Sequence, residues 1–149
     1  MIKKALKYIF ITIFLGSVPA LFVNFNKYKE IIKPPLSPPG ALFPIVWTIL
    51  FIFMGISIYR IVITNNSEVD NLKTLYYVQL IINALWTPIF FGLNAYLLAF
   101  IWLIGLLVLV IYLTIKFNNI DKISSYLFIP YIIWLIFAGY LNLGVYLLN

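Results

Sequence analysis

The third apolar segment of the chain carries amide and aromatic side chains on one face. Gln79, Asn83, Trp86 and Phe90 are separated by 4, 3 and 4 residues, a spacing that puts them on the same side of an α-helix. An amide that faced lipid would cost free energy, so this face is expected to point into a protein interior. There the amides can bond another helix or a bound molecule, and the spacing leaves both interpretations open.

Two further apolar segments carry aromatic residues at helical spacing. Trp47 and Phe51 are four residues apart. A second face, with spacings of 3, 4 and 4, consists of Tyr131, Trp134, Ala138 and Asn142. Aromatic stripes usually indicate packing, and Trp near a helix end usually marks the water interface. Trp47 and Trp134, however, lie several residues inside their apolar runs, where an indole N–H needs a partner.

The chain lacks the residues that several common kinds of catalysis and metal binding require. It has no cysteine and no histidine, which removes disulfides, thiolate chemistry and the usual ligands of zinc, copper and haem iron. No charged residue lies deep in an apolar segment, and there is no Ser-His-Asp set, carboxylate pair or phosphate-binding glycine loop. We therefore expect no metal site, and no tightly bound cofactor.

All fourteen charged side chains fall in four short groups, at residues 3 to 7, 27 to 33, 60 to 73 and 116 to 122. A helix needs about 20 apolar residues to cross roughly 30 Å of hydrocarbon. The gap from 74 to 115 has 42 residues, so it must fold back on itself, and Gly92-Leu93-Asn94-Ala95 is the turn signal near its middle.

The composition agrees with a membrane protein, with 9% charged residues, 64% hydrophobic residues and a mean hydropathy of +1.08. We expect an all-α integral membrane fold with one domain over residues 1–149. Its five transmembrane helices are predicted at about 5–23, 41–63, 73–92, 95–116 and 123–147.

The net charge of +6 is distributed unevenly across the expected crossings. Seven cations fall on one side, namely Lys3, Lys4, Lys7, Arg60, Lys73, Lys116 and Lys122, and three on the other, namely Lys27, Lys29 and Lys33. By the positive-inside rule, the N-terminus lies in the cytoplasm and the C-terminus outside. We prefer this interpretation to nucleic-acid binding, because nearly all the cations are Lys, whereas Arg is the residue that recognises phosphate with two hydrogen bonds.

Residues 3–20 also resemble a signal peptide, whose removal would leave four crossings.

The longest expected connection, loop one (residues 24 to 40), has four prolines and a glycine in its last eight residues, Lys33 to Gly40. Such a stretch cannot be helical and is expected to form a stiff, extended strap across one end of the bundle. It is either a rigid linker or a lid over a cavity.

Three further prolines, Pro44, Pro88 and Pro130, lie inside or at the ends of helices and are expected to bend them.

Four motifs together resemble a known family over nearly the whole chain. They are Lys33-Pro34 leading to Pro38-Pro39-Gly40, then PIVWT at 44–48, QLIINALWTPIFFG at 79–92, and IPYIIW at 129–134 followed by Phe137-Ala138 and Leu141-Asn142. With these motifs the chain resembles the translocator protein family, also called the tryptophan-rich sensory, peripheral-type benzodiazepine receptor or TspO/MBR family.

The resemblance implies a five-helix bundle, usually a homodimer, with a cavity that opens towards loop one. Members bind porphyrins, and some bind sterols and benzodiazepine-type drugs. Carried over by position, the residues around the ligand are Tyr28, Trp47, Phe51, Gln79, Asn83, Trp86, Phe90, Trp134, Ala138 and Asn142. Light-dependent breakdown of protoporphyrin has been proposed for some bacterial members, and Trp47 and Trp134 match the tryptophans that would be catalytic.

Two positions depart from the family pattern. No basic residue follows Tyr140 or Tyr146, as the sterol-recognition pattern of animal members requires, so we expect no cholesterol site. Position 36 is Leu where many members carry an aromatic residue, which leaves the loop contact there open.

We therefore predict a tetrapyrrole-binding protein of a bacterial cell membrane. Aromatic faces would stack on a flat porphyrin or haem-type ligand, while Gln79, Asn83 and Asn142 would meet its polar edge. Two alternatives stay open. One is an enzyme that degrades porphyrin in the light through tryptophan; the other is a small-molecule transporter or a sensory partner of a larger complex.

Overall fold

The computed structural model describes residues 1–149 as five long helices without any strand. They are α1 (Ile2–Ser17), α2 (Leu42–Val62), α3 (Val69–Thr87), α4 (Tyr96–Asn118) and α5 (Lys122–Leu148). The 3-10 turn η1 (Val18–Phe22) extends α1, the π-helical turn η3 (Pro88–Gly92) extends α3, and the 3-10 turn η2 (Asn26–Lys29) lies in loop one. All five helices are long and apolar enough to cross a membrane, which confirms the predicted fold class.

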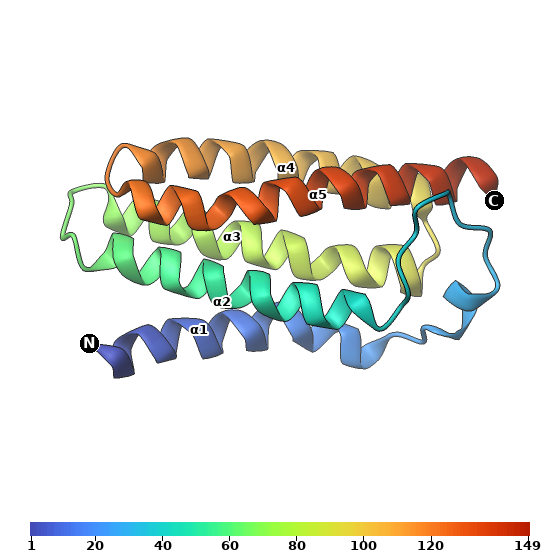
Figure 1. The fold of residues 1–149 in the computed structure, drawn as a ribbon, viewed down its shortest axis with the longest axis horizontal. Coiled ribbons are helices and arrows are strands. Elements are labelled where there is room, and N and C mark those ends of the chain that lie inside the picture. The colour runs from blue at the N-terminus through green and yellow to red at the C-terminus, as the bar shows by residue number, and fades with distance from the viewer.

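The helices run side by side in one bundle, with the chain reversing at each end (Figure 1). The N-terminus lies at one end with the α2–α3 and α4–α5 connections. Loop one, the α3–α4 connection and the C-terminus lie at the other, which we call the loop-one end. The long apolar gap folds back at the predicted turn, where Asn94 takes the left-handed conformation with φ of 52°, which Asn tolerates better than most residues.

The helix ends differ from the predicted ones for two physical reasons. Helix α3 begins at Val69, before the expected residue 73, because a helix does not stop where its side chains become polar; Asp70 and Lys73 lie in its first turns. At the other end, Pro88 has no N–H to donate, and the helix widens into η3, in which the Leu93 N–H donates to the Pro88 carbonyl at 2.9 Å.

The fully buried core lies towards the end opposite loop one. Met54 and Ile58 of α2, Tyr76 of α3, Leu113 of α4 and Phe128 of α5 each have an exposed fraction of 0%. These residues come from the helix halves that meet at the N-terminal end of the bundle. The half near loop one holds instead three half-buried tryptophans, which are Trp47, Trp86 and Trp134.

A polar clamp fixes α2 to α5 at the N-terminal end. The Arg60 guanidinium donates to the Asp121 carboxylate at 2.7 Å, and Asp121 also caps α5 by accepting from the Ser124 N–H at 3.2 Å. Ser57 and Ser124 each donate to the other's backbone carbonyl. The guanidinium, together with the Ser124 bonds, holds the pKa of Asp121 below its usual range, so the carboxylate stays charged.

Loop one is held against the C-terminal part of α5. The Asn149 side chain pairs with the Ile32 backbone, accepting from its N–H at 3.0 Å and donating to its carbonyl at 2.7 Å. The Tyr140 hydroxyl donates to the Pro35 carbonyl at 2.6 Å. Leu36, in contrast, is 83% exposed and has a left-handed φ of 69°, so its side chain is largely uncovered.

Close packing of α1 on α2 generates the first prediction. A Cβ at Gly55 would lie 2.6 Å from the Ile9 Cα of α1, whereas a Cβ at Gly105 would meet nothing within 4 Å. We expect Gly55→Ala to destabilise the protein by about 1–3 kcal/mol, because backbone atoms cannot yield as a side chain would. Thermal unfolding in detergent measures this, with Gly105→Ala as the matched control in α4. Equal melting temperatures for the two variants would contradict the packing argument.

Candidate functional site

None of the ten residues predicted around a ligand is exposed. Five are buried, namely Phe51, Gln79, Asn83, Phe90 and Asn142, and the other five are half-buried, namely Tyr28, Trp47, Trp86, Trp134 and Ala138. The helical faces that the spacing predicted are therefore inward faces. The aromatic residues among them, together with neighbouring rings, form two groups.

The first group, the inner cluster, joins α2 to α5 and consists of Trp47, Phe51, Tyr131 and Trp134. Trp47 stacks on Phe51 at 5.6 Å between ring centroids and meets Trp134 edge-on at 6.4 Å. Tyr131 lies edge-on to Trp47 at 6.1 Å. Phe51 also fills the space beside Gly16, where a Cβ would lie 2.3 Å from the Phe51 ring, so this cluster reaches α1.

The second group, the outer cluster, lies under loop one and consists of Tyr28, Trp86, Phe90, Phe91 and Tyr96. Trp86 and Phe90 stack at 4.9 Å, and Tyr96 of α4 meets Phe90 at 4.9 Å. Tyr28 of loop one packs on Phe91 at 5.4 Å and on Phe90 at 6.4 Å. Loop one therefore adds a ring to the outer cluster, in addition to spanning the end of the bundle.

Phe43, which sequence reasoning missed, connects the two clusters. Its ring lies 6.4 Å from Tyr28 and 5.9 Å from Trp134, edge-on to both. Helical spacing could have found it, because Phe43, Trp47 and Phe51 follow one another at intervals of four. Tyr131 was assigned to the right face of its helix but not to the ligand site.

The buried amides of this region bond other helices. Asn83 donates to the Tyr131 hydroxyl at 2.7 Å, and that hydroxyl donates to the Gln79 carbonyl oxygen at 2.9 Å. The Trp86 indole donates to Asn142 at 3.0 Å, and Asn142 donates to the Tyr96 backbone carbonyl at 2.8 Å. The interpretation of these amides as interhelical bonding groups is confirmed, while their contact with a ligand stays a prediction.

One buried polar group has no partner. Among buried side-chain nitrogen and oxygen atoms, only the Trp134 Nε1 makes no hydrogen bond. Two of the three other indoles donate hydrogen bonds, since Trp86 bonds Asn142 and Trp102 donates to the Ile82 carbonyl at 2.7 Å. A buried N–H without an acceptor costs about 1–3 kcal/mol, so this group is available to an acceptor that the protein itself does not supply.

Trp134 also borders an apolar groove on the α2–α5 seam. The groove has a volume of about 540 Å³ and is lined by Val46, Ile49, Leu50, Phe53, Pro130, Ile133, Trp134 and Phe137. Ile49 and Ile133 in its wall are 47% and 62% exposed, so the groove opens towards the lipid. Trp134 is the one residue that belongs both to this groove and to the ten predicted positions.

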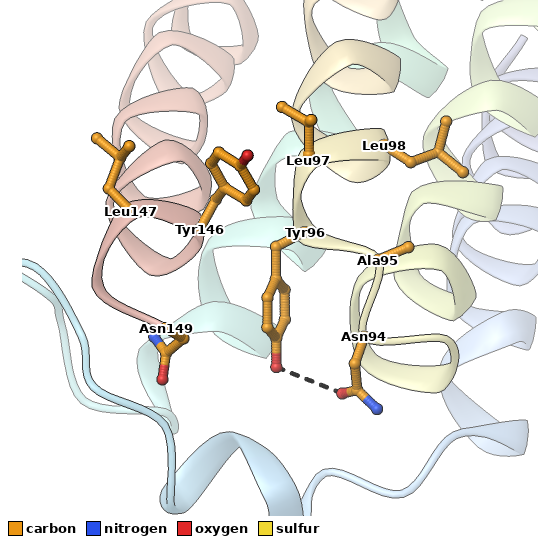
Figure 2. A pocket seen from close by; sticks show the side chains of 8 residues that line it. All are labelled: Asn94, Ala95, Tyr96, Leu97, Leu98, Tyr146, Leu147 and Asn149. Atoms are coloured by element: carbon orange, nitrogen blue, oxygen red, sulfur yellow. Dashed lines mark hydrogen bonds between the residues drawn. The ribbon is translucent and has the colours of Figure 1, made fainter.

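A larger hollow of about 700 Å³ lies where the start of α4 meets the end of α5 (Figure 2). None of the ten predicted residues and no tryptophan lines it. Two of its polar side chains are engaged within the protein, since the Tyr96 hydroxyl donates to Asn94 at 3.4 Å and the Asn149 side chain holds Ile32. We therefore place the candidate site at the α2–α5 seam beside Trp134, and not in the larger hollow.

These features define an integral membrane bundle with aromatic clusters in its interior and one buried, unpaired indole beside a lipid-facing groove. Comparison with known proteins agrees with this class: the sequence profile of the TspO/MBR family matches residues 8–148. The chain belongs to the TspO/MBR family.

Relatives from distant organisms support the assignment. The chain is 36% identical over 124 residues to the tryptophan-rich protein TspO of Chlorobaculum tepidum, covering 82% of this chain and 78% of that protein. It is 37% identical over 136 residues to the protein CrtK of Rhodobacter capsulatus, covering 90% and 85%. With the translocator protein of Bos taurus it shares 30% identity over 132 residues, covering 87% and 78%.

The second prediction concerns Tyr131, whose hydroxyl joins the amides of α3 to α5. We expect Tyr131→Phe to lower stability by about 1–3 kcal/mol, because the Asn83 amide and the Gln79 carbonyl would both lose a buried partner. Thermal unfolding in detergent tests this. Tyr126→Phe is the matched control on the same helix, since Tyr126 is 58% exposed. A Tyr131→Phe protein as stable as the control would show that the amides find other partners.

Proposed function

We propose that this protein binds a flat, largely apolar tetrapyrrole of the porphyrin type within the membrane, at the α2–α5 seam. The observation that carries the proposal is the Trp134 Nε1, a buried donor without an acceptor, at the border between the lipid-facing groove and the inner cluster. The groove volume of about 540 Å³ lies within the range of small-molecule sites in proteins.

The chemistry of the seam suits a porphyrin for two reasons. Its walls are apolar and aromatic, so they can bury the faces of a macrocycle and stack on it. The free indole N–H can donate to an acceptor on the ligand edge. The rings of the inner cluster pack against one another without a gap for a ligand. A macrocycle that enters from the groove would therefore have to push the Trp134 ring away from the Trp47 ring.

The lack of histidine and cysteine favours a metal-free porphyrin, or a haem held through its ring faces, over a haem with strong axial bonds. The relatives' names, which include tryptophan-rich proteins, are consistent with a function of the tryptophans. The protein would lie in a bacterial cell membrane with its N-terminus in the cytoplasm, as supported by the excess of cations at the N-terminal end of the bundle.

The third prediction tests the tryptophans directly. We expect the double variant Trp47→Phe and Trp134→Phe to bind protoporphyrin about tenfold or more weakly than the wild type. Each replacement reduces the stacking area, and the second removes the free N–H; together these losses amount to about 1–2 kcal/mol. Protoporphyrin titration in detergent, followed by porphyrin absorbance, measures the dissociation constant.

Trp102→Phe is the control, because Trp102 lies on α4 and its indole bonds the Ile82 carbonyl, away from the seam. It should leave the dissociation constant unchanged. If the double variant binds protoporphyrin as tightly as the wild type, the seam is not the porphyrin site.

A second candidate function is light-dependent oxidation of the bound porphyrin by dioxygen. The observation that favours it is the pair of Trp47 and Trp134, whose ring centroids are 6.4 Å apart, so that both could exchange electrons with a photoexcited macrocycle beside them. No general acid or base is available in the seam, so the reactive chemistry would be that of the porphyrin.

Irradiation in air distinguishes catalysis from binding alone. The enzymatic candidate predicts that the porphyrin absorbance falls faster with the wild-type protein than in detergent alone. It also predicts that the double variant, at a concentration that saturates it with porphyrin, loses this acceleration. Equal rates for protein and detergent would reject catalysis and leave binding.

A further inference from the structure

Lys33 is a cation without a carboxylate partner at the edge of the outer cluster. Its Nζ lies 4.6 Å from the centre of the Tyr28 ring, and the side chain is half-buried. The two ion pairs of the protein are Arg60–Asp121 and Lys116–Glu68, both at the other end of the bundle. The Tyr28 ring is therefore the one contact found for the Lys33 charge.

The loop around Lys33 carries an excess of positive charge. Loop one contains Lys27, Lys29, Lys33 and Glu30, so three cations and one anion give it a net charge of +2. Lys27 and Lys29 are exposed. A cation that is partly withdrawn from water without an anion loses hydration, so Lys33 differs energetically from the two other lysines of the loop.

The backbone on both sides of Lys33 is fixed. Ile32 is held through its N–H and its carbonyl by the Asn149 side chain. Pro34 is buried, and it packs so closely on Gly144 that a Cβ there would lie 2.5 Å from the proline ring. Residues 32 and 34 thus anchor Lys33 to α5, which limits the positions that its ammonium group can reach and reduces the entropy lost when it binds an anion.

A continuous line of rings connects Lys33 to the proposed porphyrin site. Tyr28 lies beneath the lysine, Phe43 packs on Tyr28 at 6.4 Å, and Trp134 packs on Phe43 at 5.9 Å. A flat ligand that stacks in the seam would lie along the rings from Trp134 to Tyr28. One edge of its macrocycle would then lie beneath loop one. Carboxylates on that edge would come out of the apolar interior, where an unpaired charge is costly.

We propose that Lys33 binds a carboxylate on the edge of the ligand and so selects tetrapyrroles that carry acidic side chains, with the macrocycle oriented so that this edge faces loop one. The proposal rests on the proposed porphyrin site. The bond would be a charge-assisted hydrogen bond from the ammonium group. Burial raises the pKa of the Tyr28 hydroxyl, which keeps that neighbour uncharged and able to donate as well.

The test compares two porphyrins that differ only at the carboxylates. Protoporphyrin and its dimethyl ester are titrated into wild-type protein and Lys33→Gln, in nanodiscs of zwitterionic phosphatidylcholine. We expect Lys33→Gln to weaken protoporphyrin binding about tenfold and to leave binding of the ester unchanged. Lys33→Arg keeps the charge and should retain most of the affinity for the free acid.

Lys29→Gln is the matched control, because it removes the same charge from the same loop at an exposed position. It should change neither titration. Equal weakening of both porphyrins by Lys33→Gln would show that Lys33 only holds the loop, and no weakening of either would show that it contacts no ligand carboxylate; both results overturn the proposal.

The net negative headgroup of an anionic lipid is the other anion that could reach this lysine. Repeating the titrations in nanodiscs that contain anionic phosphatidylglycerol separates the two sources. If Lys33→Gln weakens protoporphyrin binding in the anionic discs alone, the lysine recognises a headgroup and the proposal fails. If the wild type binds neither porphyrin, the proposed function itself fails. If the wild type binds the ester tightly and Lys33→Gln changes neither titration, the proposed function stands and only the role of Lys33 is rejected.

Discussion

The structure depends on one constraint: a polar side chain inside a bundle surrounded by lipid is costly unless it finds a hydrogen-bond partner within the protein, because no water is available there. The Tyr131 hydroxyl meets it by joining Asn83 and Gln79 of α3 to α5, and Asn142 meets it by joining Trp86 to the Tyr96 carbonyl of α4. These bonds fix the rotation of three helices about their own axes. The rotation in turn decides which aromatic rings face one another.

The bundle is tightly packed in one half and holds the aromatic clusters in the other. At the N-terminal end, fully buried side chains and the Arg60–Asp121 clamp hold α2 against α5. Towards loop one the same two helices border a groove, and Trp134 keeps an unpaired N–H beside it. An opening of the seam at this end would leave the clamp intact, so stability and the proposed ligand binding rest on different parts of one helix pair.

Loop one lies at one end of the bundle and contacts both α5 and the outer cluster. Asn149 and Tyr140 hold its backbone on α5, while Tyr28 places a ring in the outer cluster. These contacts agree with the interpretation of the loop as a rigid linker, while its role as a lid over a cavity stays a prediction. Each proline fixes its own φ, although the chain turns at Leu36, whose φ is 69°. The contacts of the loop with α5 determine where Tyr28 and Lys33 lie.

The sequence by itself determined the five crossings, the turn at Gly92 to Ala95 and the inward faces of α2, α3 and α5, because charge placement and helical spacing are local properties. It did not give the start of α3 at Val69, since a helix continues beyond the apolar boundary. Only the tertiary structure decided that Asn83 bonds a phenol, that Phe43 links two clusters and that the Trp134 indole stays unpaired. Spacing identifies the face of one helix, but partners across helices follow from how the helices rotate and pack, which no single segment encodes.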